Sequence, residues 1–249
     1  MTATTVSCFT SSYEAKKYDM EERVTALWAS EEFGAEGADA ELARFDLSAS
    51  EVVEQVLVKA EREAAAEFGG GPFPRNAVGL GRWLYLVRNL NVLLAAKGTG
   101  WEVYEPDGIC RILNAERKVA IVVQAGDEMT GRPKAAGSRY PRTRRDRGAA
   151  VLRTVSFNGA PMLPEFEAER EEELRLEDLD TWFLLVRAGE GKVAGELSLP
   201  RPVLGDSKRI EAWGQRILLG VTEVDGVAAS NPSTDDFPDD GIDFPVTRR

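Results

Sequence analysis

The stretch Trp182–Leu199, WFLLVRAGEGKVAGELSL, predicts a β-hairpin more clearly than any other part of the chain. Apolar residues predominate in both of its arms, Trp182–Arg187 and Val193–Leu199, and the first arm begins with two aromatic residues. Between the arms, Gly189-Glu190-Gly191 supplies the glycines that a tight turn favours. Pro200 then ends the second arm, because proline cannot donate a ladder hydrogen bond. We therefore expect a sheet in the second half of the chain.

Upstream of this hairpin, three short β-rich runs with intervening turn residues predict an antiparallel meander. The three runs are Trp101–Glu105, Ile109–Leu113 and Val119–Gln124. Further along, Ala150–Phe157 is predicted as another strand, and Leu218–Val224 as the last one. Between them, the spacing of Ile210, Trp213 and Ile217 suggests a short helix.

The first hundred residues instead favour helices. Met20–Trp28 has apolar residues at helical spacing, in a segment that Gly34 is expected to end. Ser48–Glu51 has the pattern of a capping box and starts a helix that the glycines after Phe68 interrupt. A third helix is predicted over Gly81–Lys97, with Gly98 after its end.

These elements predict an α+β fold, with N-terminal helices packed on a mainly antiparallel sheet. At 249 residues the chain is long enough for one such domain. We expect it to span residues 1–225, with a helical part over 1–98 and a sheet-rich part over 99–225. Residues 226–249 are rich in Ser, Pro, Asp and Gly and are expected to form a flexible acidic tail.

Composition excludes several classes of chemistry. Histidine is absent, which removes Ser-His-Asp and Cys-His nucleophilic systems. Two cysteines cannot supply the four ligands of a structural zinc site. No secretory signal or membrane-spanning run is recognisable, so a cytoplasmic protein without a membrane partner is expected. We predict no cofactor. Mg²⁺ is required by only one of the alternative functions.

A basic segment stands out in this acidic chain, whose net charge is −11. Residues 132–147, RPKAAGSRYPRTRRDR, carry seven cations and one acid. The cations are Arg132, Lys134, Arg139, Arg142, Arg144, Arg145 and Arg147. Guanidinium groups bind phosphate in bidentate fashion, and Tyr140 is suited to stacking on an unpaired base. The segment therefore predicts a nucleic-acid-binding loop, unless its arginines pair with neighbouring acids such as those of Glu165–Asp180.

A second pattern consists of Pro106-Asp107, eight intervening residues and Glu116-Arg117-Lys118. It resembles the metal-binding signature of the restriction-endonuclease-like nucleases. The resemblance implies that Asp107 and Glu116 hold Mg²⁺ while Lys118 assists the attacking water. The same residues also fit two ordinary β-turns, since Pro106-Asp107-Gly108 is a favoured turn sequence.

The C-terminal residues Asp239, Asp240, Asp243 and Phe244 resemble the acidic tip by which bacterial single-stranded DNA-binding proteins recruit partner enzymes. This tail is expected either to bind a protein partner or to compete with nucleic acid for the basic loop. A solubilising role is the alternative.

Taken together, these features predict a non-catalytic accessory protein in nucleic-acid transactions. The first alternative is a Mg²⁺-dependent nuclease that uses Asp107, Glu116 and Lys118. The second is an acidic protein–protein interaction module or inhibitor, whose tail or acidic helices engage a basic partner. DNA or RNA preference, oligomeric state and pathway are beyond these patterns.

Overall fold

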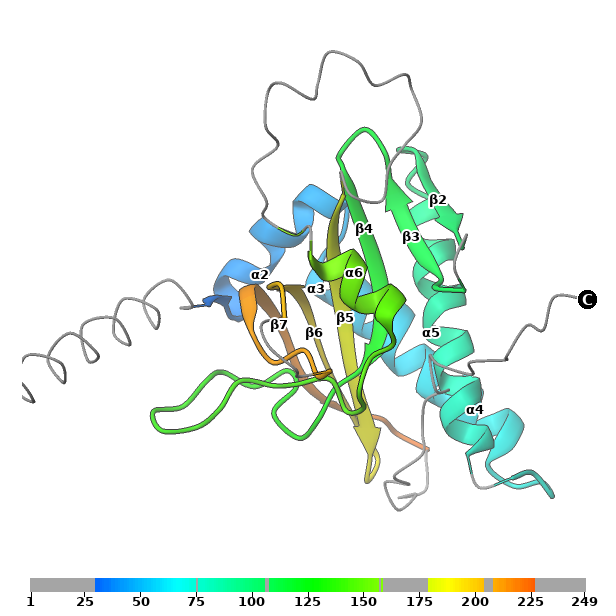
Figure 1. Cartoon of the computed structure of the whole chain (residues 1–249). Coiled ribbons are helices and arrows are strands. Elements are labelled where there is room, and N and C mark those ends of the chain that lie inside the picture. The colour runs from blue at the N-terminus through cyan, green and yellow to red at the C-terminus, as the bar shows by residue number, and fades with distance from the viewer. Residues whose placement is uncertain are drawn as a thin grey trace, which may run out of the picture.

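The computed structural model describes residues 30–74, 76–105, 108–156, 158, 179–203 and 208–226. The predicted helix around Met20–Trp28, nearly all of the acidic run Glu165–Asp180 and the acidic tail after Gly226 lie outside these residues. The described part is an α+β structure with a seven-stranded mixed sheet (Figure 1).

Among the described residues, all but one of the helical elements lie between residues 35 and 95. They are α2 (Ala35–Leu42), the 3₁₀ turn η1 (Ala43–Phe45), α3 (Ala49–Glu51), the π-helical stretch η2 (Val52–Val58), α4 (Lys59–Phe68), α5 (Ala77–Ala95) and α6 (Ala149–Ser156). The capping box at Ser48 is confirmed, because its hydroxyl accepts from the Glu51 N–H and the Glu51 carboxylate accepts from the Ser48 N–H. Gly98 has φ +66°, as expected beyond a helix end.

The sheet has the strand order β1-β7-β6-β5-β4-β3-β2. Its strands are β1 (Glu31–Phe33), β2 (Trp101–Tyr104), β3 (Arg111–Asn114), β4 (Val119–Ala125), β5 (Asp180–Gly189), β6 (Lys192–Pro200) and β7 (Trp213–Glu223). The predicted hairpin is confirmed as β5–β6 and the predicted meander as β2–β3–β4. The pairs β4–β5 and β1–β7 are parallel, so the sheet is mixed, with its other neighbours antiparallel.

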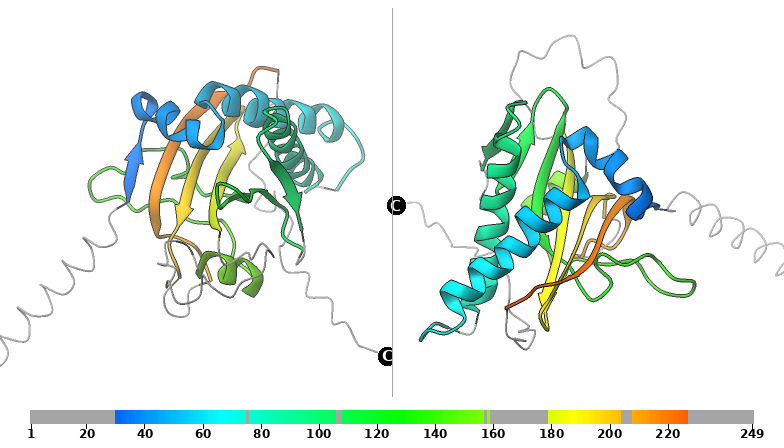
Figure 2. Two further views of the ribbon diagram at one scale, coloured as in Figure 1. Left: turned by 90° about the horizontal axis from the view of Figure 1, so that it is seen from above. Right: turned by 180° about the vertical axis from the view of Figure 1, so that it is seen from behind.

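Helices and loops cover opposite faces of this sheet (Figure 2). On one face, α2 to α5 bury the larger core, which includes Leu42, Leu86 and Trp182. On the other face, α6 packs Val151 and Val155 against Phe183 of β5. The predicted helix layer against a sheet is thus confirmed, and the second face belongs to α6 and the loops around it.

Two predicted elements are wrong in type. Ala149–Ser156 is helix α6 and not a strand, because Val151 and Val155 lie one helical turn apart and together fill the smaller core. Trp213–Glu223 is strand β7, so the short helix suggested around Trp213 does not form. Trp213 packs on the α6 face while Ile217 packs under the helix layer, which a single helical stripe would not allow.

The end of the first predicted helical segment is also different. Glu31–Phe33 forms strand β1, parallel to β7, and the chain turns at Gly34 into α2. Pairing with the exposed edge of β7 satisfies backbone groups of this short segment, which outweighs its local preference.

Asp46 joins the helix layer to the meander. Its carboxylate accepts hydrogen bonds from Thr99 Oγ1 (2.6 Å), Trp101 Nε1 (3.2 Å) and Arg117 NH2 (2.8 Å). Burial alone would raise the pKa of Asp46, but these three donors outweigh it and lower the pKa below its ordinary value.

We therefore predict that Asp46→Asn destabilises the fold by about 1 kcal/mol at pH 7. A carboxylate with a lowered folded-state pKa stabilises the fold above its unfolded pKa of about 3.9, and this contribution is lost as pH falls through the folded pKa. Urea unfolding at pH 7 and near pH 3 should show the gap between wild type and variant narrowing in acid. A gap independent of pH would contradict the assignment.

Candidate nucleic-acid interface

The basic segment Arg132–Arg147 is a loop, as predicted. It belongs to the connection between β4 and α6. An isolated antiparallel β-bridge pairs Thr143 of the loop with Gly126, the residue directly after β4. The loop lies at the end of the sheet where β4 and β5 finish (Figure 1). It is fixed to the sheet at two places.

The first anchor is a buried ion pair under the start of the loop. Glu196 of β6 and Arg216 of β7 are both 0% exposed, and Glu196 Oε1 accepts from Arg216 Nε at 3.1 Å. The second oxygen of Glu196 accepts the backbone N–H of Gly131 at 2.8 Å. Ser198 Oγ also donates to Glu196 (2.8 Å). One carboxylate therefore joins two strands and the first turn of the loop.

Arg216 extends this anchor in two further directions. It donates to the carbonyl of Arg132 at 3.1 Å and forms an ion pair with Glu32 of β1. Burial alone would lower the pKa of Arg216, but Glu196 and Glu32 outweigh that effect and raise it. The guanidinium thus stays charged and ties the loop, the sheet and its edge strand together.

The second anchor holds the end of the loop. The indole N–H of the buried Trp213 donates to the carbonyl of Pro141 (2.7 Å). Thr143 and Ile210 exchange two hydrogen bonds, from Thr143 N–H to the Ile210 carbonyl (2.9 Å) and from Ile210 N–H to Thr143 Oγ1 (3.1 Å). Arg147 is itself buried and donates its backbone N–H to Lys208. The loop therefore has a fixed course.

Several loop arginines contact acids of the same connection. Arg139 forms ion pairs with Asp127 and Glu128, and Arg142 Nε lies 3.6 Å from Asp127 Oδ2. The hydrogen bond to Asp127 raises the pKa of Arg139 above its ordinary value. Part of the loop's charge is thus balanced locally, as the alternative interpretation of the segment expects.

Tyr140 lies between two cations. Lys134 Nζ is 5.0 Å from the centre of its ring and Arg216 Cζ is 5.6 Å from it, both within the range of cation–π attraction. The Tyr140 hydroxyl accepts from the Ser30 N–H at 3.4 Å. The ring is half-buried in this setting, and its stacking on a base stays a prediction.

The outer surface of the loop keeps cations in contact with solvent. Arg132 and Lys134 are exposed, and Arg142, Arg144 and Arg145 are half-buried. In the part of the chain that the structure describes, the Arg132 guanidinium has no hydrogen-bond or ion-pair partner. Residues 126–147 contain seven cations against three acids, so the loop retains an excess of positive charge.

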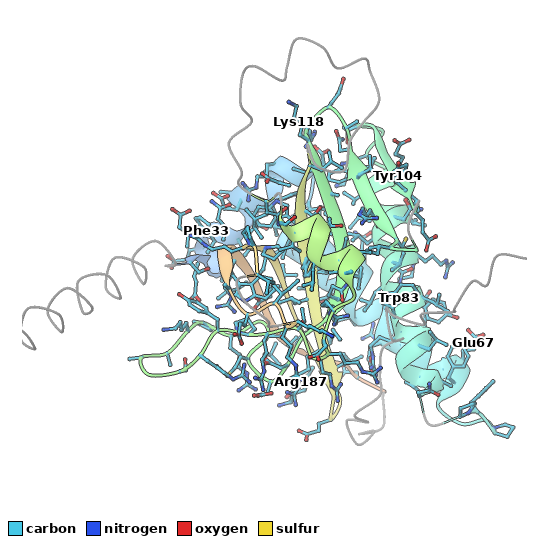
Figure 3. All side chains as sticks on the ribbon, in the orientation of Figure 1. Phe33, Glu67, Trp83, Tyr104, Lys118 and Arg187 are labelled. Carbon is cyan, nitrogen blue, oxygen red and sulfur yellow. The ribbon has the colours of Figure 1, made fainter. Side chains whose placement is uncertain are left out.

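Two residues of the nuclease alternative, Glu116 and Lys118, lie at the end of the sheet far from the basic loop. Glu116 and Lys118 are exposed on the turn between β3 and β4, and Asp107 lies outside the described residues. Figure 3 shows Lys118 and Arg187 at opposite ends of the sheet. Arg117, the middle residue of the motif, donates to the carbonyl of Arg44 (2.6 Å) and to Asp46, which gives it a structural role.

Among the described residues, no group of three or more His, Cys, Asp or Glu side chains could hold a metal ion. The same residues contain no helix long and apolar enough to cross a membrane. The tail residues Asp239, Asp240, Asp243 and Phe244 lie outside the described part. Comparisons with protein-family models, curated proteins and solved structures found no match.

The loop was predicted from the sequence, but the residues that anchor it were not. Glu196 was the available signal, since it is the one charged residue of the strand sequence VAGELSL. A charge in a buried strand requires a partner, and Arg216 is the corresponding cation in β7.

Proposed function

We propose that this protein is a non-catalytic accessory protein in nucleic-acid transactions, and that it contacts phosphates through the basic loop Arg132–Arg147. The observation that carries the proposal is a loop fixed at both ends by buried contacts while an excess of cations remains on its outer surface. A fixed loop does not lose backbone entropy on binding, so its cations are preorganised for an anion.

The charge distribution supports nucleic acid over a small anion. Several cations are spread along the loop, which suits a repeating array of phosphates. The rest of the chain is strongly acidic, and this repels nucleic acid from other surfaces. Contact would therefore be confined to one end of the sheet.

We predict that Lys134→Gln combined with Arg142→Gln weakens oligonucleotide binding. Each lost phosphate contact should reduce the slope of log affinity against log salt by about 0.7–0.9. Fluorescence polarisation with labelled single- and double-stranded oligonucleotides at two salt concentrations measures both quantities. Both side chains are at least partly exposed, and Asp127, the partner of Arg142, keeps its ion pair with Arg139, so the fold should tolerate the change.

A matched control is available on the opposite face of the sheet. Lys59→Gln with Arg88→Gln removes the same two charges from exposed positions on α4 and α5, and should leave binding unchanged. If wild type shows no salt-dependent affinity for either oligonucleotide, the proposed function is wrong. Mg²⁺-dependent cleavage that Lys118→Ala abolishes would instead establish the nuclease alternative.

A further inference from the structure

A shallow pocket of about 100 Å³ lies beside the start of the basic loop. Glu128, Thr130 and Arg132 form its loop side, and the ends of β5, β6 and β7 form the rest. A volume of this size holds about three water molecules. It suits a single phosphate group rather than a whole nucleotide.

Sheet register explains why the pocket exists. Arg187 of β5 pairs with Ala194 of β6, which pairs with Val221 of β7, so these three side chains form one row across the sheet. The next row on the same face of the sheet begins with Gly189 opposite Lys192. Small residues at Gly189 and Ala194 leave a depression between the longer side chains of Arg187 and Lys192.

Three cations surround this depression, and two of them form weak ion pairs. Arg187 NH1 lies 3.7 Å from Glu128 Oε2, and Lys192 Nζ lies 3.4 Å from the exposed carboxylate of Glu223. Exposed ion pairs of this kind contribute little to stability, so an anion can compete for these cations. Arg132 is the third cation, with the unengaged guanidinium described above.

The acids in the pocket do not cancel this charge. Glu128 is shared between Arg187 and Arg139, so its negative charge serves two guanidinium groups. Glu190 is on the exposed hairpin turn, where solvent and salt screen its charge. The backbone of Arg132 is fixed at the rim of the pocket, because its carbonyl accepts a hydrogen bond from Arg216.

From this arrangement we infer that Arg132, Arg187 and Lys192 form a binding pocket for one phosphate group. The inference deepens the proposed function and rests on it for the source of that group, a phosphodiester of the bound strand. Two guanidinium groups and one ammonium provide bidentate and point-charge contacts to the same tetrahedral anion. The pocket would set the register of the strand on the loop.

Two arms test the inference. In the first, Arg187→Gln and Lys192→Gln are each measured for binding of a labelled single-stranded oligonucleotide, with Arg88→Gln as the matched control. Each pocket variant should weaken binding and lower the salt slope, by at most the value of about 0.7–0.9 that one phosphate contributes, and the control should leave both unchanged. In the second, thermal unfolding is compared in sodium phosphate and in sodium chloride of equal ionic strength. Wild type should gain about 2–4 °C in phosphate, and Arg132→Gln with Arg187→Gln should remove the gain.

The outcomes separate this inference from the proposed function. If wild type binds the oligonucleotide and the pocket variants keep its affinity and salt slope, the pocket inference is overturned while the proposed function stands. If wild type does not bind oligonucleotides but its phosphate stabilisation depends on Arg132 and Arg187, the proposed function fails. The pocket then takes a free phosphate or phosphomonoester. Absence of both effects overturns both.

Discussion

Glu196→Gln is expected to destabilise the fold by about 3 kcal/mol, because it removes one charge from a fully buried ion pair. Arg216 would keep its charge at 0% exposure with Glu32 as its remaining carboxylate partner. For a domain of this size the loss corresponds to a fall of about 6–12 °C in melting temperature. Urea or thermal unfolding measures it directly.

A surface ion pair between neighbouring strands provides the matched control. Glu223→Gln removes the same charge from the pair with Lys192, whose side chains are 79% and 53% exposed. Its effect should stay below about 1 kcal/mol. The double variant Glu196→Leu with Arg216→Leu should recover part of the loss, since no unpaired buried charge remains. Equal effects of Glu196→Gln and Glu223→Gln would show that the buried anchor contributes little.

Glu196→Gln should also weaken the nucleic-acid binding that we propose. Gly131 is held to the sheet through Glu196, and Arg132 through Arg216, so a weakened pair loosens the start of the loop. Oligonucleotide affinity should then fall even at temperatures where the variant remains folded. The cause would be a cost of ordering the loop on binding, because no loop cation has been removed.

Local patterns predicted the elements that local contacts stabilise. The β5–β6 hairpin and the β2–β3–β4 meander connect neighbouring strands through short turns, so alternation and turn residues were sufficient to find them. The parallel pairing of β4 with β5 depends on the long connection that contains the basic loop and α6. No local pattern encodes this pairing.

The wrong predictions concern elements whose secondary structure depends on residues that are distant in the sequence. Ala149–Ser156 is rich in residues that suit either a strand or a helix, and its packing on Phe183 favours the helix. Around Trp213, apolar spacing suggested a helix, but β6 on one side and β1 on the other offer backbone partners that make it a strand. Residue type located the candidate loop, whereas its anchors required the fold.

Gly131→Ala is expected to lower the free energy of unfolding by about 3 kcal/mol, as much as Glu196→Gln. Gly131 has φ +72°, a region that costs an L residue about 1 kcal/mol. An added Cβ would also lie 2.6 Å from the carbonyl oxygen of Gly220 and 2.9 Å from that of Gly195. These oxygens belong to β7 and β6, and the paired strands cannot move aside without losing ladder hydrogen bonds.

The variant Gly137→Ala separates the effect of close packing from the effect of backbone conformation. Gly137 lies in the same loop with φ +77°, yet a Cβ added there meets nothing within 4 Å. Gly137→Ala should therefore lose about 1 kcal/mol, from backbone conformation alone. The difference between the two variants in urea unfolding isolates the contact of the loop with β6 and β7. If both variants lower the free energy of unfolding equally, the start of the loop does not pack against these strands. The fixed loop backbone on which the phosphate proposal depends is then absent.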